Sequence, residues 1–205
     1  MRVAQDTLRE LAGQTGAQLE KPVEIYIYAS SGDLQGAMIF PQEWTGGVTF
    51  TRYGTISIGI SQSNLVWGSR AMAHELTHLV TYQMIFNAYG DIPVWLSEGL
   101  AMYFEGDEQA QFASALSRAV ATNSLFSVRS LASPFSAFAD QAILGYAESR
   151  SIVEFLIEEY GQAKMLDLLN TFHDGASYDG ALMKVYGFDM DGLNVLWRKG
   201  IGAGS

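Results

Sequence analysis

The 205-residue chain contains no cysteine, and its 12 lysines and arginines are outnumbered by 22 aspartates and glutamates. The absence of cysteine excludes disulfides, cysteine nucleophiles and thiolate metal ligands. A net charge of −10 excludes the basic surface that nucleic acids require, and it argues against binding to an anionic membrane. Hydrophobic residues make up 48%, which is enough for a folded core.

Long apolar runs are also missing. None reaches the roughly 18 residues of a membrane-spanning helix, so we expect no membrane span. The segment Met1–Asp6 lacks the apolar stretch of a signal peptide. Ile201–Ser205 is glycine-rich and would suit the end of a domain excised from a longer protein. The four lysines, among many Ser, Thr, Gly and Tyr, favour an extracytoplasmic prokaryotic domain.

The first third of the chain is predicted to be rich in strands. Its period-two alternation and β-branched residues indicate strands, and apolar periodicity indicates an amphipathic helix before them. The last two strands would form a hairpin that turns near Tyr53 and Gly54. The predicted elements are a helix over 2–15, a strand over 22–28, a short helix over 33–40, and strands over 46–51 and 55–60.

From Ser69, a plausible helix N-cap, the pattern becomes helical. Strands followed by helices indicate an α+β fold. We expect one domain, 1–205, with a strand-rich lobe over 1–68 and a helical part over 69–205. The predicted helices are 69–87, 93–105, 107–122, 139–160, 162–173, 177–186 and 189–199.

Two of the three histidines lie in the sequence His74-Glu75-Leu76-Thr77-His78, an HExxH pattern. On a helix, positions i and i+4 share a face, so both imidazoles can bind one zinc ion. Glu75 stands where a general base for a metal-bound water belongs. The pattern indicates a zinc-dependent hydrolase, most often a peptidase; a pair of hydrogen-bonded core histidines is the alternative.

Glu98 is the candidate third ligand. It is the one carboxylate in the apolar segment Trp95–Ala101. A buried glutamate without a partner is costly, and a metal ion would remove that cost. Two histidines and one glutamate leave the fourth zinc position for water, as catalytic sites do. A surface position on the helix is the alternative for Glu98.

These residues resemble the gluzincins, the zinc peptidases that include thermolysin-like and aminopeptidase N-like enzymes. The run Trp95–Phe104 is similar to the WLxEGxAxY pattern that follows HExxH in peptidase MA-like families. Gly145–Ser149 and Val185–Phe188, each before a helix, are also similar to those families. The resemblance covers about residues 70–199.

The resemblance implies a zincin, thermolysin-like fold with a small N-terminal twisted sheet and a helical C-terminal lobe. It implies one Zn²⁺, held by His74, His78 and Glu98, and a peptide or protein substrate. Glu75 would take a proton from the zinc-bound water and pass it to the leaving amine. Tyr146 would stabilise the oxyanion, although a packed core tyrosine is an equal alternative.

Two departures from the resemblance concern residues around the metal site. Thermolysin-like enzymes often carry an aspartate one turn after the ligand glutamate, where this chain has Met102. Glu105 is another candidate neighbour of the site, although the end of a helix explains it better. Neither Gly36–Phe40 nor Gly46–Thr49 completes the GAMEN motif of aminopeptidases, so we do not expect a dedicated aminopeptidase.

The segment 55–60 is the candidate edge strand for an extended peptide, with an ordinary structural hairpin as its alternative. Two other functions remain open for the whole chain. One is a catalytically silent zinc-binding module that recognises a peptide or partner. The other is a structural helical domain with a chance motif. Cleavage preference, endo- or exopeptidase mode and oligomeric state are left open by the sequence.

Overall fold

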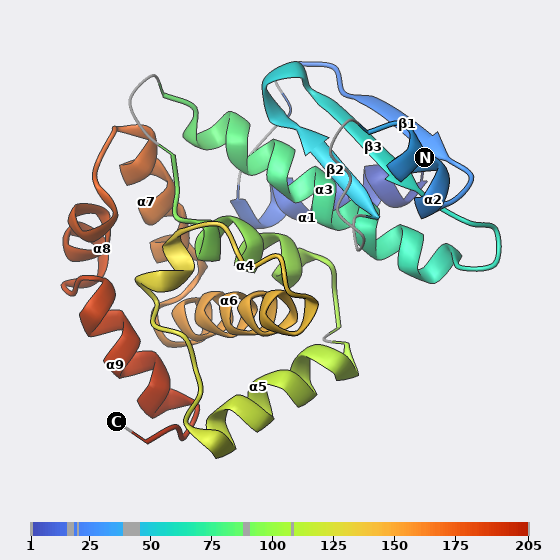
Figure 1. Ribbon diagram of the computed structural model, residues 1–205. Coiled ribbons are helices and arrows are strands. Elements are labelled where there is room, and N and C mark those ends of the chain that lie inside the picture. Colours follow the sequence, from blue (N-terminus) through green and yellow to red (C-terminus); the bar gives the residue numbers. More distant parts are fainter. Residues whose placement is uncertain are drawn as a thin grey trace. The chain divides into compact units, whose positions relative to one another are not determined.

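The computed structural model describes residues 2–15, 19, 21–38, 46–87, 91–107 and 109–204 (Figure 1). Contacts divide the chain into two compact units. Unit 1 comprises Met1–Gln83 and Phe104–Gly106, and unit 2 comprises Met84–Tyr103 and Asp107–Ser205. The single domain 1–205 stays a prediction.

Unit 1 contains a three-stranded sheet and the helix of the HExxH motif. The sheet has the order β1-β3-β2, with β1 parallel and β2 antiparallel to β3. In chain order its elements are α1 (Arg2–Thr15), β1 (Glu24–Tyr28), α2 (Ser31–Gly36), β2 (Gly47–Phe50), the 3₁₀ turn η1 (Thr51–Tyr53), β3 (Thr55–Gly59) and α3 (Leu65–Ile85).

The predicted hairpin is confirmed, but the prediction that 55–60 is an edge strand is wrong. β3 pairs with a strand on both of its sides, so β1 and β2 are the edges of the described sheet. The turn ends at Gly54, whose φ of 63° is left-handed and suits glycine. The predicted helix over 33–40 is α2, which begins earlier, at Ser31; positions 39 and 40 lie outside the described residues.

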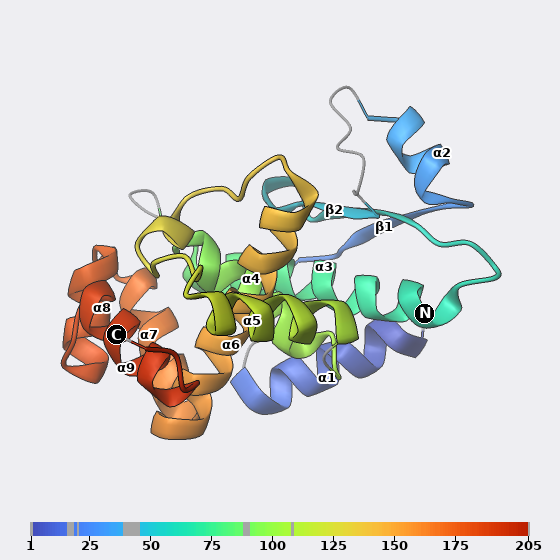
Figure 2. The same cartoon turned by 60° about the horizontal axis from the view of Figure 1, so that its bottom comes forward.

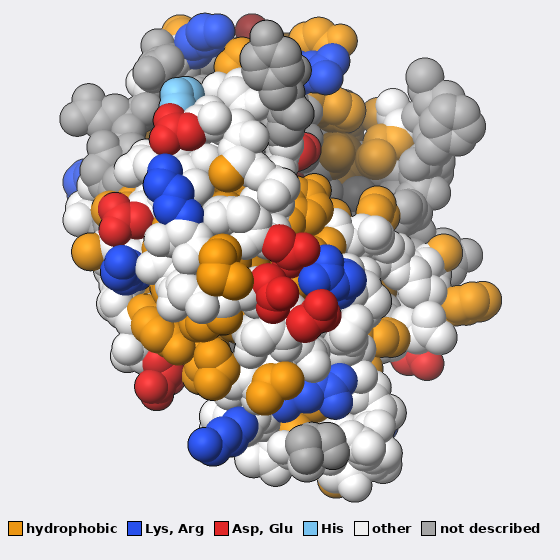
Figure 3. Space-filling view, turned by 90° about the vertical axis from the view of Figure 1, so that its left-hand side faces the viewer, with side chains coloured by type: hydrophobic (Ala, Val, Ile, Leu, Met, Phe, Trp, Pro, Cys, Tyr) orange, Lys and Arg blue, Asp and Glu red, His pale blue; other side chains and the backbone are white. Residues whose placement is uncertain are grey.

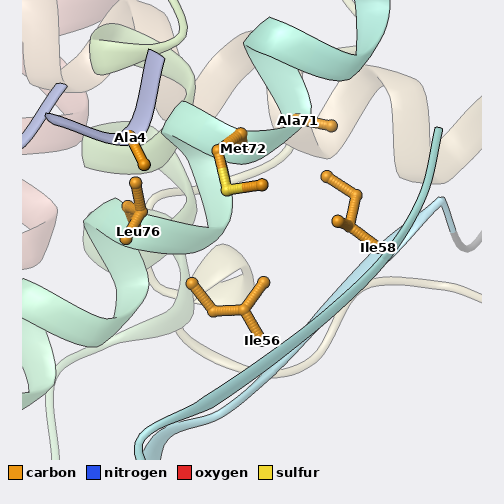
Figure 4. Close-up of a cluster of buried hydrophobic side chains, with 6 residues drawn as sticks. All are labelled: Ala4, Ile56, Ile58, Ala71, Met72 and Leu76. Carbon is orange, nitrogen blue, oxygen red and sulfur yellow. The ribbon is translucent and has the colours of Figure 1, made fainter. Parts of the chain in front are cut away.

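The core of unit 1 lies between β3 and α3 (Figure 4). Ile56 and Ile58 are fully buried, and they point from the sheet toward α3. On α3 they meet Ala71, Met72 and Leu76, and Ala4 of α1 approaches Leu76. This packing places one face of the sheet against the helix that carries the motif.

Helix α3 begins earlier than predicted. Gly68 N donates to Asn64 O, so the helix is already formed at Leu65. Ser69 is inside it and donates from Oγ to Leu65 O at 2.9 Å, so the N-cap assigned to Ser69 is wrong. The extra turn adds Leu65 and Val66, which are largely exposed.

Unit 2 is helical, as expected. Gly161, Gly175 and Gly187 separate its last helices, and each has a φ of 85°. Ser177 and Asp189 cap the last two helices by accepting from Gly180 N and Gly192 N. Its elements are α4 (Val94–Phe104), α5 (Ala110–Thr122), the 3₁₀ turn η2 (Ser130–Ala132), α6 (Ala139–Tyr160), α7 (Gln162–His173), α8 (Tyr178–Tyr186) and α9 (Met190–Gly200).

Helices α4 and α6 approach each other very closely (Figures 1 and 2). A Cβ atom at Gly99 would lie 2.4 Å from Ser149 O and 2.6 Å from Val153 Cγ2, so only glycine fits there. Arg150 Nη1 donates to Met102 O at 2.6 Å across the same contact. The packing holds the backbone of α4, and with it Glu98, in a defined position within unit 2.

The surface of unit 2 carries paired charges. Arg129 donates to Asp179 at 3.0 Å and to Asp191 at 2.8 Å, which ties the loop before α6 to the first turns of α8 and α9. Figure 3 shows acidic and basic side chains in contact on the side where α7 to α9 lie in Figure 1.

Throughout the described ranges, every helix is too short or too polar to cross a membrane. The whole is a mostly helical protein with a small sheet, compatible with the α+β class.

Candidate active site

The two motif histidines lie on one face of α3, as their spacing predicts. Their rings meet edge to face, with centroids 4.8 Å apart and an interplanar angle of 80°. The Nε2 atoms of His74 and His78 are 3.1 Å apart. Two nitrogens bound to one tetrahedral zinc at 2.0–2.1 Å would be about 3.3 Å apart. The pair therefore fits two ligands of a single zinc ion.

Glu105 lies beside the other nitrogen of His74. The distance from His74 Nδ1 to Glu105 Oε1 is 3.5 Å, and both side chains are largely buried. Metal-bound histidines commonly present their second nitrogen to a carboxylate, which orients the ring. Glu105 follows the last residue of α4, and it also contacts His74 of the motif. Met102, which replaces the usual aspartate, packs with Phe112 and Ala147 in an apolar cluster.

Glu75 is buried against β2, with 8% of its surface exposed. Thr49 Oγ1 is 2.6 Å from Glu75 Oε2 and 3.0 Å from the Glu75 carbonyl oxygen. A Cβ atom at Gly47 would lie 2.7 Å from Glu75 Oε1, so the backbone of β2 contacts the carboxyl group. The hydrogen bond and the close approach together define where this carboxyl group lies.

Nothing in the sequence singles out Thr49. Gly46–Thr49 belongs to the predicted strand over 46–51, and it does not complete the aminopeptidase motif. The signal that could have found Thr49 is the alternation of a strand, which puts Gly47 and Thr49 on one face. That the face is the one toward α3 depends on pairing with β3, where Thr49 lies opposite the buried Ile56.

Glu98 lies on α4 in unit 2. Its helix neighbours Trp95 and Leu96 have no exposed surface, and Glu98 itself is half-buried. The carboxylate is therefore held on an apolar helix, as the sequence indicates. The two histidines belong to unit 1. The role of Glu98 as their fellow ligand stays a prediction.

Tyr146 lies on α6 and packs as a core aromatic residue. Its ring meets Phe135 edge to face at a centroid distance of 5.2 Å, and it joins the cluster of Met102, Phe112 and Ala147. This environment supports the alternative of a packed tyrosine. Its role in oxyanion stabilisation stays a prediction.

A second buried glutamate, Glu148, lies two residues further along α6. It has no exposed surface, and Phe126 N donates to its Oε1 at 3.0 Å. No described residue hydrogen-bonds to its Oε2. Burial raises the pKa of Glu148 to about 8, against the smaller opposing effects of the Phe126 hydrogen bond and the charge of Arg198.

The sequence matches the family model of the peptidase MA superfamily over residues 3–203. Because the match covers nearly the whole chain, the protein belongs to this superfamily. Comparison with curated proteins found no match. Membership supports a peptidase at a general level, in agreement with the resemblance seen in the HExxH and Trp95–Phe104 segments.

Proposed function

We propose that the protein is a zinc-dependent metallopeptidase of the gluzincin type, with a thermolysin-like catalytic fold. The observation that carries the proposal is the pair of Nε2 atoms of His74 and His78, 3.1 Å apart on α3. Glu75, the next residue after His74, is held by Thr49 at 2.6 Å. A metal-binding pair beside an anchored carboxyl group is the constellation that metal-assisted hydrolysis needs.

His74, His78 and Glu98 are the proposed zinc ligands. They are candidate metal ligands that each offer one nitrogen or oxygen atom. Bound zinc lowers the pKa of its water to about 7 and polarises a carbonyl group. Glu105 would orient His74 through Nδ1. Glu98 is proposed as a ligand because of its sequence context and the family membership of the chain.

Glu75 is the proposed general base. It would accept a proton from the attacking water and then deliver it to the leaving amine. Its hydrogen bond to Thr49 occupies Oε2, and Oε1 would handle the proton. Tyr146 is the proposed donor to the oxyanion.

The edge strand β2 is the proposed docking place for an extended peptide substrate. In the described sheet it pairs with β3 alone, so the backbone groups of its other side are open to a further strand. Gly47 and Thr49 of this strand contact Glu75. A peptide paired with β2 would therefore lie close to the proposed general base. The predicted docking strand was 55–60, but this segment is the central strand of the sheet, so β2 is proposed instead.

A catalytically silent zinc-binding module is the second candidate. It explains the histidine pair equally well, because a pure binding module can use the same ligands. It does not explain a glutamate that is anchored by a short hydrogen bond beside those ligands, because such a module needs no base.

The test is a peptide-library digest read by mass spectrometry, with zinc supplied. We expect the wild type and Glu159→Gln, a control on an exposed surface of α6, to cleave peptides. Glu75→Gln should bind the same amount of zinc and cleave nothing. Equal cleavage by Glu75→Gln would remove the proposed base. Zinc binding without cleavage by any of the three proteins would favour the silent module.

Metal analysis tests the ligands separately. We expect one zinc per wild-type chain and a loss of zinc in His78→Ala and Glu98→Ala. Zinc that binds the folded state should also raise the thermal midpoint of the wild type, and a chelator should reverse this. A structural domain with a chance motif would show neither effect.

We also propose an extracytoplasmic prokaryotic setting, supported by the low lysine content. Fractionation of a native host with an antibody to the protein tests it. Recovery with the cytoplasmic fraction alone would contradict the proposal.

A further inference from the structure

We infer that Thr49 is a positioning residue for Glu75, which deepens the proposed function and rests on it. Thr49 comes from the edge strand β2 and Glu75 from the middle of α3, 26 positions later in the chain. Both belong to unit 1. The hydroxyl group lies 2.6 Å from the carboxylate and 3.0 Å from the backbone oxygen of the same glutamate.

The contact is a hydrogen bond. Thr49 Oγ1 and Glu75 Oε2 are 2.6 Å apart, within the range of hydrogen bonds between two oxygen atoms. One hydroxyl hydrogen can be donated to Oε2, while the oxygen keeps two lone pairs. When Oε1 takes up the proton, Oε2 remains an acceptor for the Thr49 hydroxyl group. The same pair of atoms thus holds Glu75 before and after proton transfer.

Gly47, on the same face of β2 as Thr49, also lies next to the carboxyl group. A Cβ atom at position 47 would lie 2.7 Å from Oε1, 3.0 Å from Cγ and 3.1 Å from Cδ of Glu75. The carboxyl group therefore lies in the space that a side chain at position 47 would fill, and only glycine leaves that space open. Thr49 holds Oε2, and Gly47 gives the carboxyl group room beside the strand.

A merely structural role for Thr49 makes a different prediction. A buried carboxylate needs a donor, and losing one would destabilise the fold without a specific effect on the chemical step. A positioning role predicts a lower kcat with little change in KM, zinc binding or thermal midpoint. General-base catalysis depends on geometry, and small displacements cost up to about 100-fold in rate.

The experiment compares Thr49→Val, which keeps the shape and removes the donor, with Thr49→Ser, which keeps the hydroxyl group. Thr55→Val is the matched control, because Thr55 is on β3 and its hydroxyl group donates to Tyr53 O. We expect a kcat about 10- to 100-fold lower in Thr49→Val, most of it restored in Thr49→Ser, and wild-type kcat in the control. Zinc per chain and KM should be unchanged.

A second readout needs no turnover. In zinc-free protein carrying ¹³C-labelled glutamate, the Glu75 carboxyl resonance, assigned with Glu75→Gln, should shift in Thr49→Val and return in Thr49→Ser. If Thr49→Val does not fold, Gly47→Ala takes its place in the experiment. Its added Cβ should displace the Glu75 carboxyl group, shift the same resonance and lower kcat.

The outcomes separate the two proposals. Wild-type kcat in Thr49→Val, with no activity in Glu75→Gln, overturns the role of Thr49 and leaves the peptidase. An unshifted Glu75 resonance in Thr49→Val also overturns it. Cleavage that survives in Glu75→Gln, or is absent from the wild type, removes the proposed function, and the resonance then decides whether Thr49 holds Glu75.

Discussion

The two units each bury a glutamate on a long helix, but they surround it differently. In unit 1, Glu75 of α3 is 8% exposed and receives a 2.6 Å hydrogen bond from Thr49. In unit 2, Glu148 of α6 has no exposed surface and receives one backbone hydrogen bond, from Phe126 N at 3.0 Å. Burial alone therefore does not distinguish the proposed general base from a packed glutamate.

The difference lies in what each environment does for the carboxyl group. Around Glu148, burial outweighs the Phe126 hydrogen bond and the Arg198 charge, so the pKa rises to about 8. Around Glu75, a side-chain donor holds the carboxyl group in the room that Gly47 leaves beside β2, and the two motif histidines are its neighbours on α3. The environment of Glu148 suits a packed helical core, and that of Glu75 suits the proposed reaction centre.

The largest expected effect separates the two glutamates by activity. Removing the charge from Glu75 with Glu75→Gln should lower kcat about 10²- to 10⁴-fold, the range of a lost general base. The equivalent change Glu148→Gln should leave kcat within the error of the assay, because it lies outside the proposed reaction centre. Peptide-cleavage kinetics measure both; a matching loss in Glu148→Gln would end the distinction.

Stability against pH tests the environment of Glu148. Its pKa in the folded protein, about 8, lies above its ordinary value of 4.5, so the folded state binds more protons between these values. Its contribution to the free energy of unfolding should be complete below pH 4.5 and should fall as the pH rises to 8, by up to about 1.4 kcal/mol per pH unit. Urea unfolding at pH 5, 6.5 and 8 should show Glu148→Gln losing less stability than the wild type. Parallel curves would contradict the raised pKa.

Glycines extend the comparison to the backbone. Gly99→Ala should destabilise the protein by roughly 1–3 kcal/mol, because its Cβ meets Ser149 O, which belongs to the backbone of α6. Gly47→Ala should cost less stability and more activity, because its Cβ meets the movable end of Glu75. Urea unfolding and cleavage kinetics of both variants measure this. Equal losses of stability would show that unit 1 is packed as tightly as unit 2.

The smallest expected effect concerns the second nitrogen of His74. Glu105→Ala should weaken zinc binding by about 10-fold. This is the lower end of the range for residues that orient a metal ligand, because the contact between Glu105 and His74 Nδ1 is as long as 3.5 Å. Glu105→Gln should retain part of the affinity, and the exposed neighbour Asp107→Ala should retain all of it. Competition with a zinc indicator measures the affinities. If Glu105→Ala binds zinc with wild-type affinity, Glu105 does not support His74 and only occupies the end of a helix.

Much of the helical part followed from local sequence. The bounds 139–160 and 162–173 agree with α6 and α7, because apolar periodicity and a glycine at the helix end are signals within a few residues. The start of α3 was missed, because Ser69 is a good cap residue and the helix nonetheless begins a turn earlier. A local capping preference is worth about 1 kcal/mol, and the added turn includes Trp67, whose packing against the core of unit 1 can exceed it.

Helix spacing alone was sufficient to put His74 and His78 on one face, because the i, i+4 relation is a property of a single helix. Sheet order, the contact of Thr49 and Gly47 with Glu75, and the approach of Glu105 to His74 required the folded chain. Each of these joins residues far apart in sequence, and pairing with β3 or packing against α3 selects them. Local sequence therefore names the candidate reactive groups, while long-range packing supplies the neighbours that contact them.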